Sequence, residues 1–343
     1  MASILFLGGT GNISAASVRL AHAQGHRITL LNRGQRDSRD RNLPAGLEYL
    51  RADLRDEAAT ASVLGNRTFD VVAQFIAYHP AEIERDIRLF HGRCGQYFFI
   101  SSASAYEKPV RFPFITESHP LKNPYWNYSR DKIACEEVCL RAYREENFPA
   151  VIVRPSLTYE TVWPLAIGGW SDFTPIARLR GGRPLIVHGD GTSLWTVTHA
   201  DDFARGFNGL FGHPAAVGHA FHITSDEVLT WNQIYETVCA AAGVEPNLVH
   251  IPTNVLIRMN PDLAGGLLGD KAHSLIFDNS KIKRFVPDFR ATISFREGCR
   301  RTLAWFEADQ ARQTILPATD AALDHYLEIW ERMLRSGFDQ PKS

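Results

Sequence analysis

Residues Ser3–Ala16 read SILFLGGTGNISAA, and this stretch decides the fold. A short apolar run precedes the glycines and helix-forming residues follow them, which predicts a strand, a tight turn and a helix. Gly8 permits the sharp exit from the strand, and Gly11 carries no side chain that would keep a diphosphate away. We expect the following helix to aim its free N–H groups and its positive dipole end at that diphosphate. The stretch therefore predicts a dinucleotide site held by Gly8, Thr10, Gly11, Asn12 and Ile13.

The composition is that of a soluble globular protein, because 45% of the 343 residues are apolar and 22% are charged. A net charge of −1 gives no sign of a surface for nucleic acid or membrane, and no apolar run is long enough to cross a bilayer. The first apolar run is also too short for a signal peptide. The five cysteines lack metal-ligand spacing, so we expect reduced, buried thiols, no metal site and a cytoplasmic protein.

Further apolar runs alternate with helical stretches along the first half of the chain. We expect strands at Arg27–Leu31, Leu47–Ala52, Asp70–Ala77, Gln96–Ser101 and Ala150–Pro155. Such alternation forms right-handed βαβ units, which predicts an α/β fold with a doubly wound (Rossmann) parallel sheet. After residue 160 the strand alternation breaks up. We therefore expect a dinucleotide-binding domain over 1–160, to which segments near 196–230 return, and a smaller C-terminal substrate lobe over 161–343 that includes an amphipathic helix at Asp320–Ser336.

The end of the second strand is where this fold reads the adenosine ribose. Asn32 and Arg33 stand there, and no carboxylate follows until Asp37, so we favour NADP over NAD as the cofactor. The alternative is that Arg33 and Arg36 are solvated loop charges. At the end of the third strand, Asp53 and Leu54 are placed to contact the adenine, although Asp53 could instead cap the next turn.

The fifth strand runs into a segment that contains Ser102 and Ser104, and a helix follows that carries Tyr128 and Lys132. The last two residues are four apart, so their side chains share one helix face. A phenol titrates near 10 unaided, and a neighbouring ammonium brings its pKa toward neutrality, which suits a general acid/base. A serine hydroxyl from the strand end can hold a substrate oxygen beside that phenol.

These features together resemble the extended short-chain dehydrogenase/reductase superfamily, in its NAD(P)-dependent epimerase/dehydratase branch. The resemblance is carried by GGTGNIS, Ser102 and Tyr128-x-x-x-Lys132, and it extends to Arg154-Pro155 and to Gly189-Asp-Gly followed by His199-Ala-Asp-Asp. It implies hydride transfer at a carbon that bears a hydroxyl or ketone. Tyr128 then moves the hydroxyl proton, Lys132 lowers its pKa and holds the nicotinamide ribose, and Ser102 bonds the substrate oxygen. It also implies a homodimer, and cofactor contacts at Ala77 and Pro155.

The chain departs from this family at two places. Family members that act on nucleotide sugars place one arginine where this chain has Trp195 and a second before a later Gly-Asp pair, whereas the stretch Gly266–Lys271 contains none. Lys271 or His273 could substitute as a point charge, but a lysine does not reproduce the bidentate fork of an arginine, so a UDP- or dTDP-sugar substrate is in doubt. The 4,6-dehydratases follow the catalytic hydroxyl with an Asp-Glu pair, whereas Ala103 and Ser104 follow Ser102 here, which argues against dehydration. The candidate substrate-binding residues are Tyr78, His79, Ser104, Trp195 and Lys271.

We therefore predict an NAD(P)-dependent epimerase or dehydrogenase/reductase that acts on a small sugar-like substrate, which could be a sugar, a sugar acid or a nucleotide sugar. The two reactions share one machinery, and the sequence does not separate them. The alternative is a non-catalytic dinucleotide-binding protein with a regulatory or RNA-associated role. The retained Tyr128 and Lys132 and the lack of a basic patch argue against that alternative.

Overall fold

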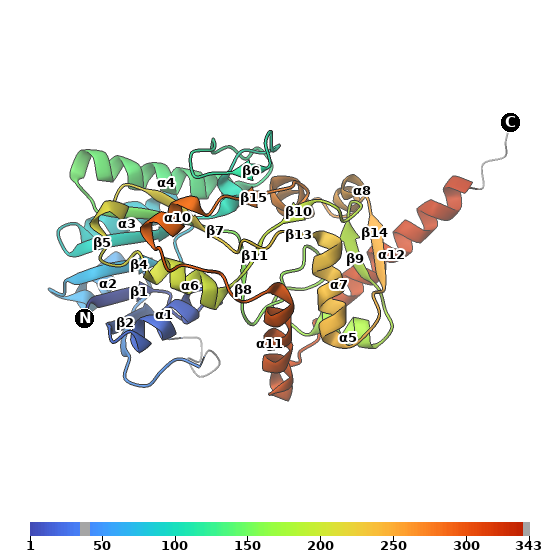
Figure 1. The fold of residues 1–343 in the computed structure, drawn as a ribbon, viewed down its shortest axis with the longest axis horizontal. Coiled ribbons are helices and arrows are strands. Elements are labelled where there is room, and N and C mark those ends of the chain that lie inside the picture. The colour runs from blue at the N-terminus through green and yellow to red at the C-terminus, as the bar shows by residue number, and fades with distance from the viewer. Residues whose placement is uncertain (35–41, 339–343) are drawn as a thin grey trace.

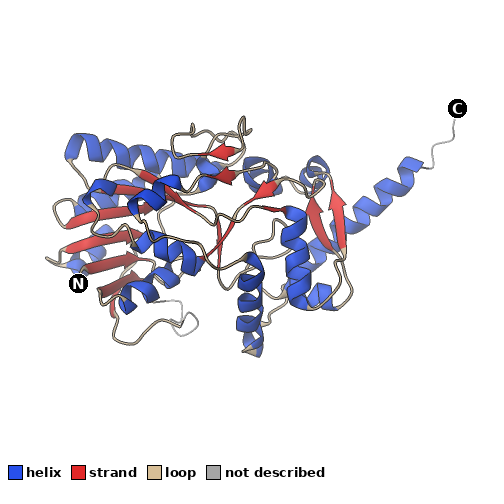
Figure 2. Cartoon of the chain, in the orientation of Figure 1, coloured by secondary structure: helices blue, strands red, loops and turns tan. Residues whose placement is uncertain are grey.

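The computed structural model describes residues 1–34 and 42–338, and it is built around one parallel sheet (Figures 1 and 2). Seven strands stand in the order β12-β7-β5-β4-β1-β2-β3, and all of the pairings within this sheet are parallel. In chain order the strands are β1 Ser3–Leu7, β2 Arg27–Asn32, β3 Glu48–Arg51, β4 Phe69–Gln74, β5 Cys94–Ile100, β7 Ala150–Pro155 and β12 Ala220–Ile223. The predicted doubly wound Rossmann sheet is confirmed.

Helices cover both faces of the sheet because its strand residues alternate between two apolar clusters. Leu5 and Val72 pack on the side of α2, α3 and α4, whereas Phe6 and Val71 pack on the side of α1, α6 and α10. These helices are α1 Ser14–Ala23, α2 Glu57–Leu64, α3 Pro80–Phe90, α4 Asn127–Glu146, α6 Ala200–Asn208 and α10 Ser280–Phe285.

Most of the chain after β7 forms a second body beside the carboxyl ends of the strands (Figure 1). It contains short strand pairs, which are β6 Phe114–Ile115 with β15 Ile276–Phe277, β8 Leu157–Tyr159 with β11 Val197–His199, β9 Leu185–His188 with β14 Leu248–Ile251, and β10 Leu194–Trp195 with β13 Leu229–Thr230. Its helices are α5 Thr174–Arg180, α7 Trp231–Ala242, α8 Thr253–Met259, α9 Leu263–Gly266, a π-helical turn at Leu267–Lys271, α11 Phe295–Glu307 and α12 Pro317–Phe338.

The last helix, α12, packs on this second body and then projects away from it (Figure 1). Leu323 and Tyr326 are buried against Ile186 and Leu256, whereas Met333 and Leu334 are 44% and 43% exposed. Only the first part of the predicted amphipathic face is therefore covered in this single chain.

Two expectations near the site need adjustment. Strand β4 ends at Gln74 rather than Ala77, because the Gln74 side-chain oxygen accepts a hydrogen bond from the Ile76 N–H (2.7 Å) and turns the chain out of the sheet. Arg36 and Asp37 lie outside the described residues.

Candidate active site

The turn between β1 and α1 has the form that the sequence predicts. Gly8 has φ of +90°, and a Cβ added there would lie 2.4 Å from Cγ2 of Ile76. The Ser14 hydroxyl accepts a hydrogen bond from the Gly11 N–H (2.8 Å) and donates one to the Gly8 carbonyl (3.0 Å), so the turn is fixed by its own residues. This glycine turn leaves room for a diphosphate at the start of α1, which is the fit that a bound dinucleotide requires.

A long pocket of about 640 Å³, here called the turn pocket, runs from this turn past the ends of the strands. Twelve of the predicted site residues line it: Gly8, Thr10, Gly11, Asn12, Ile13, Asn32, Arg33, Asp53, Leu54, Tyr78, Tyr128 and Lys132. The side chain of Asn12 is occupied, because it donates to the Thr158 carbonyl (3.0 Å) and accepts from the Glu160 N–H (3.0 Å). It therefore joins the turn to β8, and its backbone amide remains the group suited to a phosphate.

At the adenosine end of the turn pocket, Asp53 has the turn-capping contacts that the sequence allows beside an adenine contact. Its carboxylate binds the Arg55 guanidinium (2.6 Å) and accepts the Arg55 N–H (3.1 Å), and these bonds hold the pKa of Asp53 well below its usual range. The carboxylate thus closes its own short turn, whereas Asp56 caps α2. Arg33 also lines the pocket, and its charge contributes to the lowering of the Asp53 pKa.

Three serine hydroxyls connect the end of β5 with α4. Ser102 Oγ lies 2.9 Å from Ser104 Oγ, which in turn accepts a hydrogen bond from Ser129 Oγ (2.7 Å). Ser104 and Ser129 are buried, whereas Ser102 is half-buried and its hydroxyl interacts with the Tyr128 phenol. Of the two candidate serines, Ser102 is therefore the more exposed one.

Tyr128 and Lys132 share one face of α4, but their electrostatics differ from the sequence expectation. Burial raises the pKa of Tyr128 to about 12, and the Ser102 hydroxyl offsets only part of that rise. Burial also lowers the pKa of Lys132 to about 8, and its Nζ donates to the carbonyls of Ala77 (2.7 Å) and Ile100 (2.8 Å). The ammonium faces these carbonyls at 5.7 Å from the Tyr128 ring centre, so in this state desolvation outweighs the expected lowering of the Tyr128 pKa.

A second pocket of about 510 Å³, here called the tryptophan pocket, meets the turn pocket at Tyr128. The lining residues that the two pockets share are Ile13, Tyr128, Thr158 and Trp170. Predicted residues in the tryptophan pocket are Ser102, Ser104, Pro155, Trp195 and Lys271, and the sequence reasoning missed Trp126, Trp170 and Asp270. Tyr128 thus lies at a junction between two cavities.

Two predicted substrate residues lie elsewhere. Tyr78 lines the turn pocket and not the tryptophan pocket, with its ring centre 4.7 Å from Lys132 Nζ. His79 is not among the described lining residues of either pocket. Strand β4 ends early, at Gln74, and α3 begins at Pro80, directly after His79. The side chain of His79 is 65% exposed and lies 3.3 Å from the Asp131 carboxylate. The substrate-binding role of Tyr78 and His79 stays a prediction.

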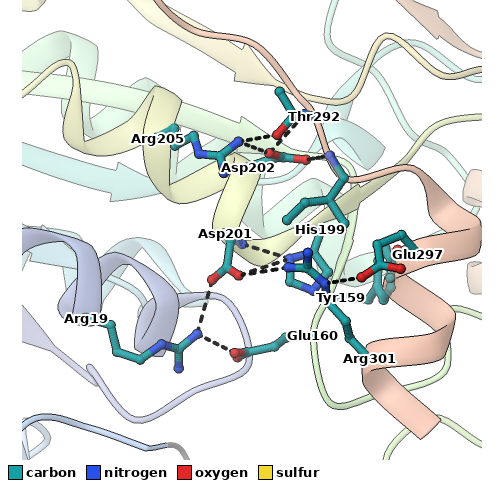
Figure 3. Close-up of polar contacts among 12 residues, drawn as sticks. Arg19, Tyr159, Glu160, His199, Asp201, Asp202, Arg205, Thr292, Glu297 and Arg301 are labelled. Atoms are coloured by element: carbon teal, nitrogen blue, oxygen red, sulfur yellow. Dashed lines mark hydrogen bonds and ion pairs between the residues drawn. The ribbon is translucent and has the colours of Figure 1, made fainter. Parts of the chain in front are cut away.

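Figure 3 shows a polar cluster that joins α1, α6 and the segment before α11. His199 Nδ1 accepts the Asp201 N–H (3.2 Å) and caps α6. Asp202, which is fully buried, accepts the N–H groups of Thr292 (3.1 Å) and Ile293 (2.8 Å). The cluster ties the second body to the sheet, and His199 acts there as a structural residue.

Other kinds of site are not found in the described part of the chain. Within residues 1–34 and 42–338, no group of three His, Cys, Asp or Glu side chains is placed to hold a metal ion. Among the helices of those same residues, none combines the length and apolar character that a membrane span requires.

Comparison with known proteins agrees with this geometry. The chain is 25% identical over 287 residues to a 2'-dehydrokanamycin reductase of Streptomyces kanamyceticus, which covers 84% of this chain and 80% of that protein. It is 26% identical over 263 residues to the chloroplast stem-loop binding protein of 41 kDa b of Arabidopsis thaliana, covering 72% of this chain but only 65% of the plant protein.

The fold is shared with solved structures. The UDP-glucose 4-epimerase from Bifidobacterium longum, solved in complex with NAD+ and UDP, superposes with a TM-score of 0.71 at 17% identity, over 91% of this chain and 99% of that one. The sequence pattern of the NAD dependent epimerase/dehydratase family matches residues 4–224, from β1 to the end of β12. The chain therefore belongs to the NAD dependent epimerase/dehydratase family.

Proposed function

We propose that this protein transfers a hydride between a bound nicotinamide dinucleotide and a secondary alcohol or ketone carbon of a sugar-like substrate. The observation that carries the proposal is the position of Tyr128 at the junction of the turn pocket and the tryptophan pocket. A phenol at that junction can reach the substrate oxygen from one pocket while the cofactor lies in the other. The nicotinamide supplies or accepts the hydride.

The side chains of the protein transfer the proton of the substrate hydroxyl. In reduction, the Tyr128 phenol donates its proton to the carbonyl oxygen as that oxygen becomes a hydroxyl, and in oxidation the phenolate takes the proton back. The Ser102 hydroxyl holds the same substrate oxygen. Lys132, with a pKa near 8, keeps its ammonium beside the pair and stabilises the phenolate once its carbonyl contacts give way to the cofactor ribose.

NADP is the proposed cofactor because Arg33 lines the turn pocket and the second strand carries no carboxylate at its end. A guanidinium pairs with a 2′-phosphate, whereas NAD dehydrogenases offer an acidic residue to the ribose hydroxyls. We expect the purified protein to bind NADPH at least about tenfold more tightly than NADH, and Arg33→Asp to remove that difference. Stoichiometric NAD(H) that survives dialysis would contradict the Arg33 argument and favour an epimerase that recycles its cofactor.

The catalytic assignment is tested with Tyr128→Phe and a matched control, Tyr125→Phe, in the same segment. Tyr125 is 39% exposed and is not among the described lining residues of either pocket. We expect Tyr128→Phe to lower hydride transfer by about 10² to 10⁴-fold while NADPH binding stays intact, and Tyr125→Phe to keep both. A Tyr128→Phe protein with full activity would refute the proposal. The homodimer and the cytoplasmic location remain predictions.

A second candidate, an RNA-associated role, is favoured by one observation, the similarity to a plant protein named for stem-loop binding. Such binding rests on phosphate contacts and therefore weakens steeply with salt. A tight RNA complex that is lost at high salt, together with unchanged behaviour of Tyr128→Phe, would support this candidate over the enzyme.

A further inference from the structure

The charged residues of the tryptophan pocket are one acid and one base. Asp270 and Lys271 line it, and Lys271 Nζ lies 3.2 Å from Asp270 Oδ2, so the two charges offset each other. The described lining contains no arginine. A diphosphate would bring two negative charges beside Asp270, and the one ammonium there is already paired.

A second ammonium lies behind this pair without reaching the pocket. Lys108 is fully buried and donates to the Tyr106 carbonyl (3.2 Å). Burial lowers the pKa of Lys108, and the Asp270 carboxylate counteracts part of that shift. Because Lys108 is not among the described lining residues, it cannot supply a phosphate contact from its present position.

The acid–base pair is held in a fixed place relative to the catalytic serine. The Lys271 carbonyl accepts the Trp231 indole N–H (3.0 Å), and His188 Nε2 lies 3.1 Å from it. The buried amide of Asn123 donates both to the Gly269 carbonyl (2.7 Å) and to the Ser104 carbonyl (2.9 Å). The π-helical turn and the strand-end serines therefore form one frame around the pocket, as π-helical turns often do at functional sites.

Three indole rings, those of Trp126, Trp170 and Trp195, are among the remaining lining residues. Trp195 is buried against Trp231 with ring centres 5.9 Å apart. Trp126 packs on Tyr128 at 4.8 Å between ring centres. Flat aromatic walls suit the apolar faces of a hydroxylated ring, whose edges then need polar partners such as Asp270.

We propose that the tryptophan pocket binds a free sugar or cyclitol ring, neutral or amino-substituted and without a nucleotide diphosphate, and that Asp270 anchors it by accepting O–H or N–H hydrogens. The proposal rests on the proposed function, because it names the substrate class of the same site. A failure of this inference can still be distinguished from a failure of the proposed function, because binding of a ring can be measured without turnover.

The experiment titrates the NADP+-loaded protein and follows tryptophan fluorescence. The probes are UDP and dTDP on one side, and D-glucose, D-glucosamine and myo-inositol on the other. We expect at least one free ring to give saturable quenching that Asp270→Asn weakens at least about tenfold, and neither nucleotide to do so at millimolar concentration. Glu137→Gln, the same chemical change at an exposed position of α4, is the control and should bind as the parent does.

Lys271→Gln provides a second variant if Asp270→Asn fails to fold. It removes the competing ammonium, so we expect D-glucosamine to bind at least as tightly and UDP still to be rejected. Saturable UDP or dTDP binding in this pocket, or no ring binding at all, would overturn the inference. Asp270-dependent ring binding without Tyr128-dependent NADP+ reduction would leave the inference standing and overturn the proposed reaction.

Discussion

Replacing Arg154 by methionine tests the buried ion pair between β7 and α4. Arg154 in β7 donates from Nε to Glu136 Oε1 (2.9 Å) and from Nη2 to Oε2 (2.6 Å), and the two side chains are 5% and 1% exposed. After the change, the Ser101 hydroxyl (2.5 Å) remains as a described hydrogen-bond donor to the carboxylate. Breaking a buried pair from one side costs about 3–5 kcal/mol, which is a factor of roughly 10² to 10⁴ in the unfolding equilibrium.

The assay is equilibrium guanidinium unfolding, followed by circular dichroism and by tryptophan fluorescence. Glu136→Gln should cost less than Arg154→Met, because Arg154 keeps the Glu117 carbonyl (3.2 Å) and the Tyr106 ring (4.9 Å). The double variant with Glu136→Leu and Arg154→Met should recover part of the loss, since no charge is then left buried alone. An Arg154→Met protein within about 1 kcal/mol of the parent, or strictly additive losses in the double variant, would refute this reasoning.

Three further predictions concern Gly8, Lys132 and the cysteines. Gly8→Ala should lower dinucleotide affinity at least about tenfold in an equilibrium titration, because its methyl would meet Ile76, whereas Gly25→Ala has a similar φ of +81° with open space and should keep the affinity. The folded-state pKa of Lys132 is about 8 and its unfolded value is near 10.5, so the unfolded chain binds more protons than the folded protein between these pH values. The free energy of unfolding should therefore rise between pH 8 and 10, by at most about 3 kcal/mol. Urea titrations should show this rise for the parent and not for Lys132→Met. A thiol reagent at pH 8 should find no fast-reacting cysteine until the protein is denatured. Cys94 is half-buried, and the other cysteines are buried: Cys135, Cys139, Cys239 and Cys299.

The sequence predicted the turn pocket well because its determinants are local. Gly8, Gly11 and Ser14 lie within one turn of chain, and their spacing alone specifies the strand, the turn and the helix start. The relation between Tyr128 and Lys132 is equally local, because a helix places residues four apart on one face.

The tryptophan pocket could be predicted only in part, because tertiary packing assembles it. Trp126, Trp170 and Asp270 come from three segments far apart in sequence, and nothing in their local pattern brings them together. The direction of the Tyr128 pKa shift was missed for the same reason. A four-residue spacing gives the proximity of Lys132, but the burial that raises the Tyr128 pKa depends on the tertiary fold around the phenol.

Strand β12 is the last strand of the sheet in chain order, so the sheet is complete only after this segment has been synthesised. Residues 220–223 pair with β7 at the edge of the sheet, although the other six strands are complete by Pro155. While the chain is being synthesised, β7 therefore exposes an unpaired edge until more than sixty further residues have left the ribosome. A nascent chain in that interval is open to pairing with another chain, and the exposure ends only when β12 pairs with β7, before α11 and α12 are made.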